Sequence, residues 1–341
     1  MQLKKHGPPG VLAPGVFPDR PPAPGEVAVD VAAAGVNFAD ILARLGLYEA
    51  APPPPFIPGI EAAGTVSAAG EGVSEPAPGR RVMLFCPFGG YATRVVVKAD
   101  YVFPIPDDMD FVTAAALPVQ YLTAWYGLHS LAGVKQGETV LVHAAAGGVG
   151  LAALQLCRAA GVRVYASVGH PAKDAAVLEA CPEARIVHCR EENFGRIIKR
   201  EEPSGVDVVM DSVGGNTFAR GWKILAPAGR YVLFGAASAV RPGRVFRLAA
   251  LWRLRHMLIV SPLKMIGENR TLSGFNLFHL AGRRDLMEPA VSGLVESWMR
   301  GEIKPKVGHV LPLTSAAEAH RLLQARQTIG KVVLLSDGGT R

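Results

Sequence analysis

The sequence predicts an α/β protein that combines a small, partly open β-barrel with a doubly wound parallel sheet. Three observations predict this fold class. The chain has 341 residues, more than one ordinary hydrophobic core holds, which indicates about two domains. Glycine and proline break its N-terminal third into short β-type runs, whereas apolar strands alternate with helical stretches after Pro118. A glycine-rich string separates the first of those apolar strands from a helical stretch.

The elements follow from the same patterns. Short strands are expected in the N-terminal third at 25–36, 64–73, 79–85 and 91–100. Residues 51–59 (APPPPFIPG) are expected to form an ordered loop, because proline lacks the N–H donor that a helix or central strand needs. The parallel sheet is predicted to use strands at 139–144, 162–168, 205–214 and 229–237, with a helix at 150–161. A helix at 314–326 and a strand at 331–335 are expected near the end.

The string HAAAGGVG (143–150) lies at the predicted turn from strand to helix. The first N–H groups of a helix lack partners there and the helix dipole is positive, so the turn can bind an anion. Gly147 lets the backbone approach a pyrophosphate, and Gly150 lets the helix pack close to the strand. The string predicts dinucleotide binding; a purely structural tight turn is the alternative. Its expected cofactor contacts are Ala145, Ala146, Gly147, Gly148, Val149 and Gly150.

Two positions in this region differ from the usual NAD-binding pattern. Ala145 stands where the usual G-x-G-x-x-G string has its first glycine, and a methyl group is tolerated there if the residue keeps ordinary backbone angles. The second strand ends in Ser167, without the acidic residue that holds an NAD ribose. Ser167 would tolerate a 2′-phosphate and Lys173 would attract it, so NADPH is expected rather than NADH. A solvated surface lysine is the alternative for Lys173.

Composition excludes several function classes. The formal net charge is +7, but basic residues do not interleave with stacking aromatics along the chain, so nucleic-acid binding is not expected. No apolar run reaches the roughly 20 residues that span a bilayer, and the N-terminus lacks the apolar core of a secretion signal. A cytoplasmic protein is therefore expected. The four cysteines form no Cys-x-x-Cys pair, so the spacing typical of cysteine metal ligands is absent.

Four motifs together carry a resemblance: GVNFAD (35–40), GLY (46–48), PGIEAAGTV (58–66) and HAAAGGVG. With them the chain resembles the zinc-independent quinone oxidoreductase branch of the medium-chain dehydrogenases/reductases, and within it the vesicle amine transport protein homologues. The resemblance implies a GroES-like catalytic domain interrupted by a Rossmann cofactor-binding domain. The expected boundaries are 1–117 and 278–341 for the catalytic domain and 118–277 for the Rossmann domain, with a basic insertion at 239–270.

The resemblance also implies whether zinc is bound and which residues take part in catalysis. Zinc alcohol dehydrogenases of this family have a cysteine where this chain has Asn37 and a histidine where it has Ile60. Amide and alkyl side chains cannot replace those ligands, so no metal is expected. By resemblance, Asn37 and Tyr48 line the substrate side of the nicotinamide pocket and donate hydrogen bonds to a carbonyl oxygen. Tyr48 supplies a proton or only packs at the rim, and Asp40 either orders the loop or takes part in catalysis.

Further cofactor contacts are implied only by the resemblance. They are Gln120, Thr123, Phe234, Gly235, Phe275, Asn276 and Arg326. Relatives often have a tyrosine at the position of Cys189, so the chain departs from the pattern beside the 2′-phosphate. The family often forms dimers, and a homodimer is expected here.

The expected function is that of an NADPH-dependent oxidoreductase, which passes hydride to a conjugated enone, enal or enoyl group or to a quinone. One alternative is a natural-product reductase or cyclase that uses the same hydride step. Another is a nucleotide-binding peripheral membrane or adaptor protein with low turnover, motivated by the basic and apolar insertion at 239–270. That insertion is interpreted as a surface helix packed on the Rossmann domain, as a lid for carrier-bound or other anionic substrates, or as a membrane contact.

Overall fold

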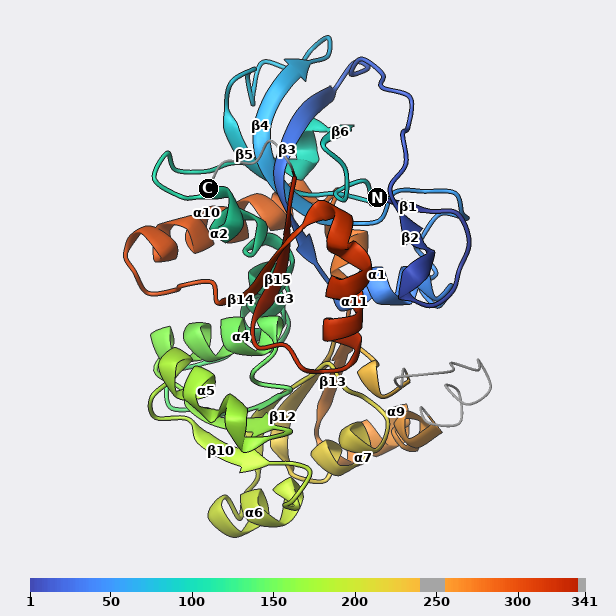
Figure 1. Cartoon of the computed structure of the whole chain (residues 1–341). Helices are drawn as coiled ribbons and strands as arrows, with labels where there is room; N and C mark the ends of the chain where they lie inside the picture. Colours follow the sequence, from blue (N-terminus) through green and yellow to red (C-terminus); the bar gives the residue numbers. More distant parts are fainter. Residues whose placement is uncertain (240–254, 337–341) are drawn as a thin grey trace. The chain divides into compact units, whose positions relative to one another are not determined.

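The computed structural model describes residues 1–239 and 255–336, and the chain divides into two structural units. The first unit comprises residues 1–122, 277–300 and the chain from residue 305 onward. The second unit comprises residues 123–276 and 301–304. Each unit carries its own sheet, as Figure 1 shows.

The first unit is built on a seven-stranded sheet in the order β14-β15-β3-β4-β5-β7, with β6 also paired to β3. Within this sheet β14 and β15 pair in parallel and the other pairs are antiparallel. Glycine and proline turns connect the strands, as expected of a partly open barrel. The strands are β3 (Glu26–Val36), β4 (Glu61–Ala69), β5 (Arg81–Phe85), β6 (Arg94–Lys98), β7 (Val102–Pro104), β14 (Val307–Pro312) and β15 (Lys331–Leu335). A separate hairpin pairs β1 (Gln2–Leu3) with β2 (Leu12–Ala13).

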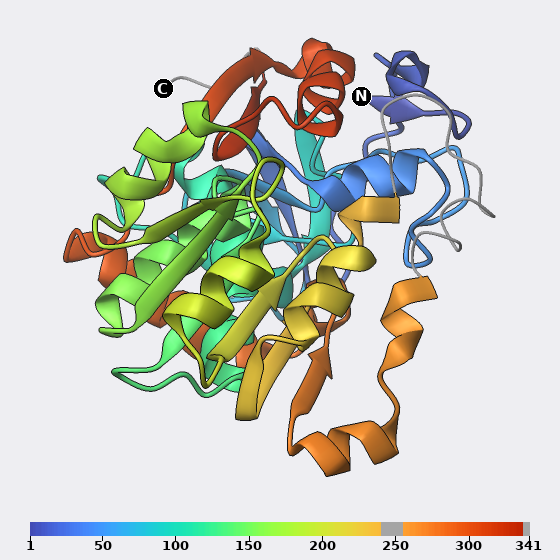
Figure 2. The same cartoon turned by 90° about the horizontal axis from the view of Figure 1, so that it is seen from below.

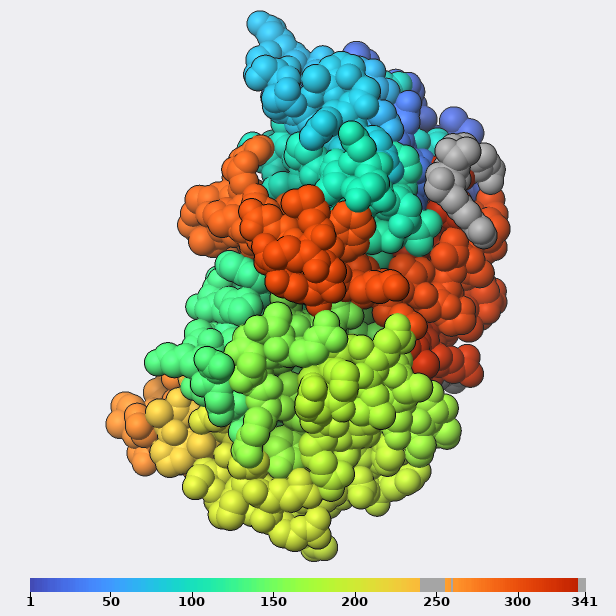
Figure 3. Space-filling model, turned by 90° about the vertical axis from the view of Figure 1, so that its left-hand side faces the viewer, coloured from blue at the N-terminus to red at the C-terminus, as the bar shows by residue number. Residues whose placement is uncertain are grey.

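Helices complete the first unit. They are α1 (Phe38–Arg44), α2 (Phe111–Ala115), α10 (Arg284–Met299) and α11 (Ala316–Gln324). Helices α1 and α11 lie side by side (Figure 1), and α2 packs on β3 and β4. Helix α10 buries Met287, Ala290 and Leu294 and exposes its other side, seen in orange in Figure 3. Helix α3 (Pro118–Trp125) begins in the first unit and ends in the second.

The second unit is a parallel sheet with the strand order β10-β9-β8-β11-β12-β13. Every neighbouring pair is parallel. The strand order reverses between β8 and β11, and right-handed crossovers therefore place the helices of the two halves on opposite faces. Figure 2 shows these strands side by side. They are β8 (Thr139–His143), β9 (Arg163–Val168), β10 (Arg185–His188), β11 (Val206–Asp211), β12 (Leu225–Leu233) and β13 (Thr271–Gly274).

An aromatic cluster fills one side of this sheet. Phe194, Phe218, Trp222 and Tyr231 are buried together, and the Phe218 and Tyr231 rings meet edge to face with centroids 4.8 Å apart. Burial of such large apolar side chains is the main stabilising contribution in a domain core. The helices are α4 (Gly148–Ala159), α5 (Asp174–Ala180), α6 (Phe194–Glu201), α7 (Asn216–Trp222) and α9 (Pro262–Glu268).

The predicted fold class is confirmed, and the basic insertion is partly described. Residues 240–254 lie outside the described part of the chain, so the interpretations that depend on them stay predictions. In the described part, Met257 and Met265 pack on the core cluster, whereas Leu258, Leu263 and Ile266 are exposed. Within residues 1–239 and 255–336, no helix is both long and apolar enough to cross a membrane.

Candidate active site

The glycine-rich string forms the predicted turn from strand to helix. Strand β8 ends at His143, and α4 begins at Gly148 with Gly147 as its N-terminal cap residue. The left-handed residue of the turn is Ala144, with φ 51°, and not Ala145. A methyl group at Ala145 is therefore tolerated for the reason given from the sequence, since that residue keeps an ordinary φ.

The two glycines act differently at this turn. A Cβ atom at Gly150 would lie 2.5 Å from the carbonyl oxygens of both Ala144 and Ala145, so the close approach of helix and turn requires glycine. A Cβ atom at Gly147 would meet only the Ala144 oxygen, at 3.2 Å, and would otherwise enter open space. Leu151 donates the first bond of the α-helical pattern, to Gly147. The Gly148, Val149 and Gly150 N–H groups precede it at the start of the helix, where such groups have no acceptor within the helix and can bind a phosphate group.

Other predicted cofactor residues gather at the same edge of the parallel sheet. Phe234 and Gly235 directly follow β12, and Phe275 directly follows β13. The Phe275 ring lies 6.0 Å from the Phe234 ring and 5.1 Å from the Tyr126 ring, centroid to centroid. Because the strands are parallel, these residues share the edge at which α4 begins. This is the edge where doubly wound sheets bind ligands.

The end of β9 carries the residues expected near a 2′-phosphate. Ser167 is buried, and its carbonyl oxygen accepts a hydrogen bond from the Ala145 N–H at 3.0 Å. Lys173 ends the short helical turn Pro171–Lys173. The Cys189 N–H donates to the Val168 oxygen at 2.9 Å, which places the next residue, Arg190, beside Gly169.

Arg190 is a candidate that the sequence alone did not identify. Its Nε lies 3.4 Å from the position that a Cβ atom on Gly169 would take. This exposed guanidinium adds a positive charge to the carboxyl end of β9. The signal that could have found it was a basic residue directly after Cys189, the position already associated with the phosphate.

Asn37 lies in a buried polar network of the first unit. Its side-chain Nδ2 donates to Glu61 Oε1 at 2.7 Å, and its Oδ1 accepts from Lys331 Nζ at 2.7 Å. Lys331 and Glu61 also form an ion pair, and Glu61 Oε2 accepts from the Val119 N–H at 2.8 Å. Asn37 is 8% exposed. No sequence pattern identified the partners Glu61 and Lys331, which lie 24 and 294 residues away.

Asp40 follows Asn37 at the start of α1 and is fully buried. Its carboxylate accepts from the Asn37 N–H at 2.8 Å, the Gly59 N–H at 3.2 Å and the Tyr91 hydroxyl at 3.0 Å. Burial raises the pKa of the Asp40 carboxyl to about 7, against the opposing effect of these donors. The contacts fit the loop-ordering role, because they tie the start of α1 to the turn at Gly59.

A chain of buried hydrogen bonds extends from Asp40 through Tyr91 to His320 and Arg44. Arg44 Nε donates to His320 Nδ1 at 3.2 Å, so the neutral ring carries its proton on Nε2. That nitrogen lies 3.2 Å from the Tyr91 hydroxyl oxygen, which accepts its proton and donates its own to Asp40. Burial, followed by the charge of Arg44, lowers the pKa of His320 to about 3.

These two pKa shifts predict opposite effects on stability. His320 takes up a proton only after unfolding as the pH falls from 6.5 to 3, so its contribution to stability is lost over that window, at up to about 1.4 kcal/mol per pH unit. Asp40 holds a proton in the folded state below about pH 7, so its contribution instead grows as the pH falls toward 4. From pH 7 to 5, the free energy of unfolding in urea should fall less in His320→Gln than in the wild type. In Asp40→Asn it should fall more steeply than in the wild type. Equal slopes in wild type and both variants would contradict this assignment.

Tyr48 lies in an aromatic cluster of the first unit. Its ring meets Phe88 and Phe278 edge to face, with centroids 6.3 and 5.8 Å apart. Phe56 also contacts Phe88 in this way. The side chain of Tyr48 is partly exposed. These ring contacts fit the packing role, and a contact of Tyr48 with a substrate stays a prediction.

The remaining predicted contacts belong to helix α3 and the C-terminal region. Gln120 and Thr123 lie three residues apart on α3 and are buried. Among the described residues, Gln120 Nε2 has no hydrogen-bond partner. Arg326 follows α11 with a left-handed φ of 60°, and Asn276 is the last residue of the 123–276 segment of the second unit. Since Gln120 and Arg326 belong to the first unit, their approach to a cofactor stays a prediction.

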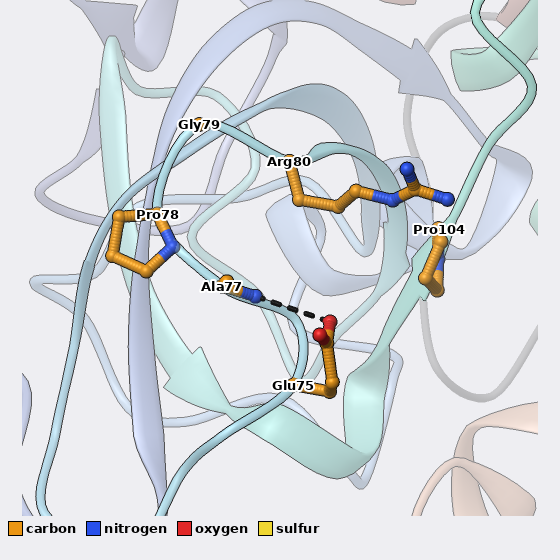
Figure 4. A pocket seen from close by; sticks show the side chains of 6 residues that line it. All are labelled: Glu75, Ala77, Pro78, Gly79, Arg80 and Pro104. Carbon is orange, nitrogen blue, oxygen red and sulfur yellow. Dashed lines mark hydrogen bonds between the residues drawn. The ribbon is translucent and has the colours of Figure 1, made fainter.

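The described residues form no metal cluster. Over residues 1–239 and 255–336, no group of three or more histidine, cysteine or acidic side chains could hold a metal ion. A pocket of the first unit lies at the turn before β5, where the Ala77 N–H donates to Glu75 (Figure 4). None of the predicted site residues lines it. Its lining residues are Glu75, Ala77, Pro78, Gly79, Arg80 and Pro104.

Comparisons with known proteins agree with this architecture. Residues 23–107 match the family described as the alcohol dehydrogenase GroES-like domain, and residues 184–334 match the zinc-binding dehydrogenase family. The chain is 39% identical over 317 residues to the synaptic vesicle membrane protein VAT-1 homolog of Rattus norvegicus, covering 92% of this chain and 78% of the relative.

Two solved structures are similar over nearly the whole chain. The Escherichia coli quinone oxidoreductase complexed with NADPH has a TM-score of 0.85 and 32% identity, with 98% of each chain covered. The CurK enoyl reductase has a TM-score of 0.82 and 30% identity, again with 98% of each chain covered. The resemblance inferred from the four motifs is confirmed. This chain belongs to the medium-chain dehydrogenase/reductase family, in the quinone oxidoreductase-like branch close to the VAT-1 homologues.

Proposed function

We propose that this protein is an NADPH-dependent oxidoreductase that reduces a conjugated acceptor, an enone, enal, enoyl group or quinone, without a catalytic zinc ion. The observation that carries the proposal is the start of α4. It is lined by backbone, has no side-chain cap, and opens onto free space at Gly147. It lies beside the point where the strand order of the sheet reverses.

Two observations support NADPH as the cofactor. The Escherichia coli quinone oxidoreductase of the same fold was solved with NADPH. In this chain the end of β9 offers Ser167, with Lys173 and Arg190 in the loops that follow β9 and β10, and β9 itself carries no acidic side chain to hold an NAD ribose. An arginine fork is well suited to bind a 2′-phosphate. NADPH, when bound, supplies the hydride.

The acceptor assignment follows from the donors of the first unit. The Asn37 amide and the Tyr48 hydroxyl would donate hydrogen bonds to the acceptor oxygen as it gains negative charge. In a conjugated acceptor that charge spreads onto an oxygen distant from the reacting carbon, so neutral donors can stabilise it. Zinc is not proposed, because Asn37 and the buried Ile60 stand where zinc-dependent relatives have ligands. In addition, the Asn37 side-chain oxygen already accepts a hydrogen bond from Lys331.

A turnover experiment tests the proposal. The purified chain is assayed with NADPH and with NADH against a panel of enones, enals, enoyl thioesters and quinones. NADPH should be preferred at least about tenfold in kcat/KM, and Asn37→Ala should lower kcat about 100-fold, as loss of one oxyanion donor does. Tyr48→Phe should give a smaller loss, and Tyr101→Phe, on an unrelated turn, serves as its control. Absence of a saturable NADPH fluorescence change at millimolar cofactor would refute the proposal.

A second candidate is a nucleotide-binding protein that acts at a membrane surface. The exposed side chains of Leu258, Leu263 and Ile266 favour it, as does the similarity to a synaptic vesicle membrane protein. In the same series of experiments, co-sedimentation with anionic vesicles and no turnover on any acceptor would select this candidate over the enzyme.

A further inference from the structure

We infer that Glu61 and Lys331 are positioning residues that orient the Asn37 carboxamide, so that one of its N–H bonds is held available for the acceptor oxygen. This inference rests on the proposed function. It concerns how the donor is aimed rather than whether the reaction occurs.

The donor and acceptor types fix the orientation of the amide. An ammonium group only donates hydrogen bonds, so the Asn37 atom 2.7 Å from Lys331 Nζ must be the amide oxygen. A carboxylate only accepts, so the atom 2.7 Å from Glu61 Oε1 must be the amide nitrogen. A flipped amide would place its oxygen against a carboxylate and its NH2 against an ammonium group. One of the two Nδ2–H bonds is used by Glu61, and the other is left for a further acceptor.

The sheet register explains how residues so distant in the sequence meet. Strand β3 lies between β15 and β4 and ends just before Asn37. Val36 pairs with Val332 in the antiparallel β3–β15 ladder, which places Lys331 next to Asn37. Ala34 pairs with Ala62 across the other edge of β3, which places Glu61 close to the strand end. The two charged partners therefore approach the amide from neighbouring strands on either side.

Burial makes this arrangement rigid. Glu61 is fully buried and Lys331 is 2% exposed, so water cannot replace either contact. Breaking a buried ion pair leaves an uncompensated charge, which is more costly than the loss of a solvent-exposed pair. The second oxygen of Glu61 also accepts from Val119 in the first turn of α3. The same carboxylate thus fixes both Asn37 and the residue that precedes Gln120.

A double-mutant cycle on kcat tests the inference. Lys331→Met and Asn37→Ala are made singly and together. Lys331→Met should lower kcat by about 10- to 100-fold in the wild-type background, as a misaimed catalytic donor does. It should lower kcat by less than about twofold in the Asn37→Ala background, because it acts through that side chain. NADPH affinity should change by less than about twofold in each variant, since cofactor contacts are untouched.

If Lys331→Met does not fold, the charge-neutral pair Glu61→Gln with Lys331→Met takes its place in the same cycle, because it leaves no lone buried charge. Equal fractional losses in the two backgrounds, or no loss in wild type, would overturn the inference.

A measurement without turnover separates this inference from the proposed function. The chain has five asparagines, so ¹⁵N-asparagine labelling gives few side-chain NH2 signals, and Asn37→Ala assigns one of them. The Asn37 pair should exchange slowly with solvent in the wild type and quickly in Lys331→Met. Unchanged exchange would refute the positioning role even if the enzyme turns over. Slow exchange in a protein without any turnover would refute only the proposed function.

Discussion

Gly150→Ala is expected to abolish NADPH binding at micromolar cofactor and to destabilise the second unit by about 1–3 kcal/mol, the cost of overpacking a rigid site. The added Cβ would lie 2.5 Å from two carbonyl oxygens, those of Ala144 and Ala145. Backbone atoms cannot swing aside as a flexible side chain does. Helix α4 must therefore move away from the turn, and its first N–H groups move with it. Urea unfolding and NADPH fluorescence titration measure the two effects.

Two other glycines serve as controls for this prediction. Gly147→Ala adds a Cβ with only one neighbour, at 3.2 Å, so it should keep the fold while weakening NADPH binding, because the methyl group fills the phosphate approach. Gly293→Ala, in α10, meets no atom within 4 Å and should be neutral or stabilise by about 0.5–1 kcal/mol. If Gly150→Ala kept the stability and the NADPH affinity of the wild type, the prediction would be wrong, because the close contact of helix and turn would then be unnecessary for either property.

Arg44→Met is expected to destabilise the first unit by at least about 3 kcal/mol, because three acceptors lose a charged donor, at about 1–3 kcal/mol each. The guanidinium is fully buried and donates to His320 Nδ1, to Gln324 Oε1 at 2.6 Å and to the Gly7 carbonyl oxygen. Methionine fills similar space but donates nothing, so three acceptors lose their partner. The free energy of unfolding in urea measures the loss.

Arg321→Met provides the matched comparison on helix α11. Arg321 is exposed and pairs with Glu318 one turn away, and such surface pairs contribute about 0.5 kcal/mol or less. Losses of equal size in Arg44→Met and Arg321→Met would mean that the buried hydrogen bonds of Arg44 contribute nothing beyond helix propensity and packing.

The second unit was the part of the fold most accessible from sequence. Its four central strands, β8, β9, β11 and β12, are mainly apolar and were predicted, whereas the short edge strands β10 and β13 were not. The predicted helix at 150–161 overlaps α4, which begins two residues earlier, at Gly148. The predicted strand at 331–335 coincides with β15. Helix α1 was not predicted, because its seven residues are too few to show a helical period. The strand predicted at 229–237 in fact begins at Leu225 and ends at Leu233.

The candidate site likewise has one part that the sequence predicted and one part that it did not. The turn at 143–150 could be predicted because all its parts are contiguous, and local steric rules connect each glycine to a function. The partners of Asn37 could not, because strand pairing brings them together from distant parts of the chain. A buried lysine also looks like an ordinary surface residue in a single sequence. Arg190 was missed because the register between β9 and β10 decides what lies beside Gly169.

The position of β15 between β14 and β3 has a consequence for synthesis on the ribosome. Residues 331–335 are made after every other strand that the structure describes, yet they complete the sheet that residues 26–36 begin. The N-terminal strands must therefore wait, without a neighbour along that edge, until the ribosome has passed residue 335. Residues 123–276 hold every described strand of the other sheet and are all made earlier, so that sheet can assemble while the first remains unfinished.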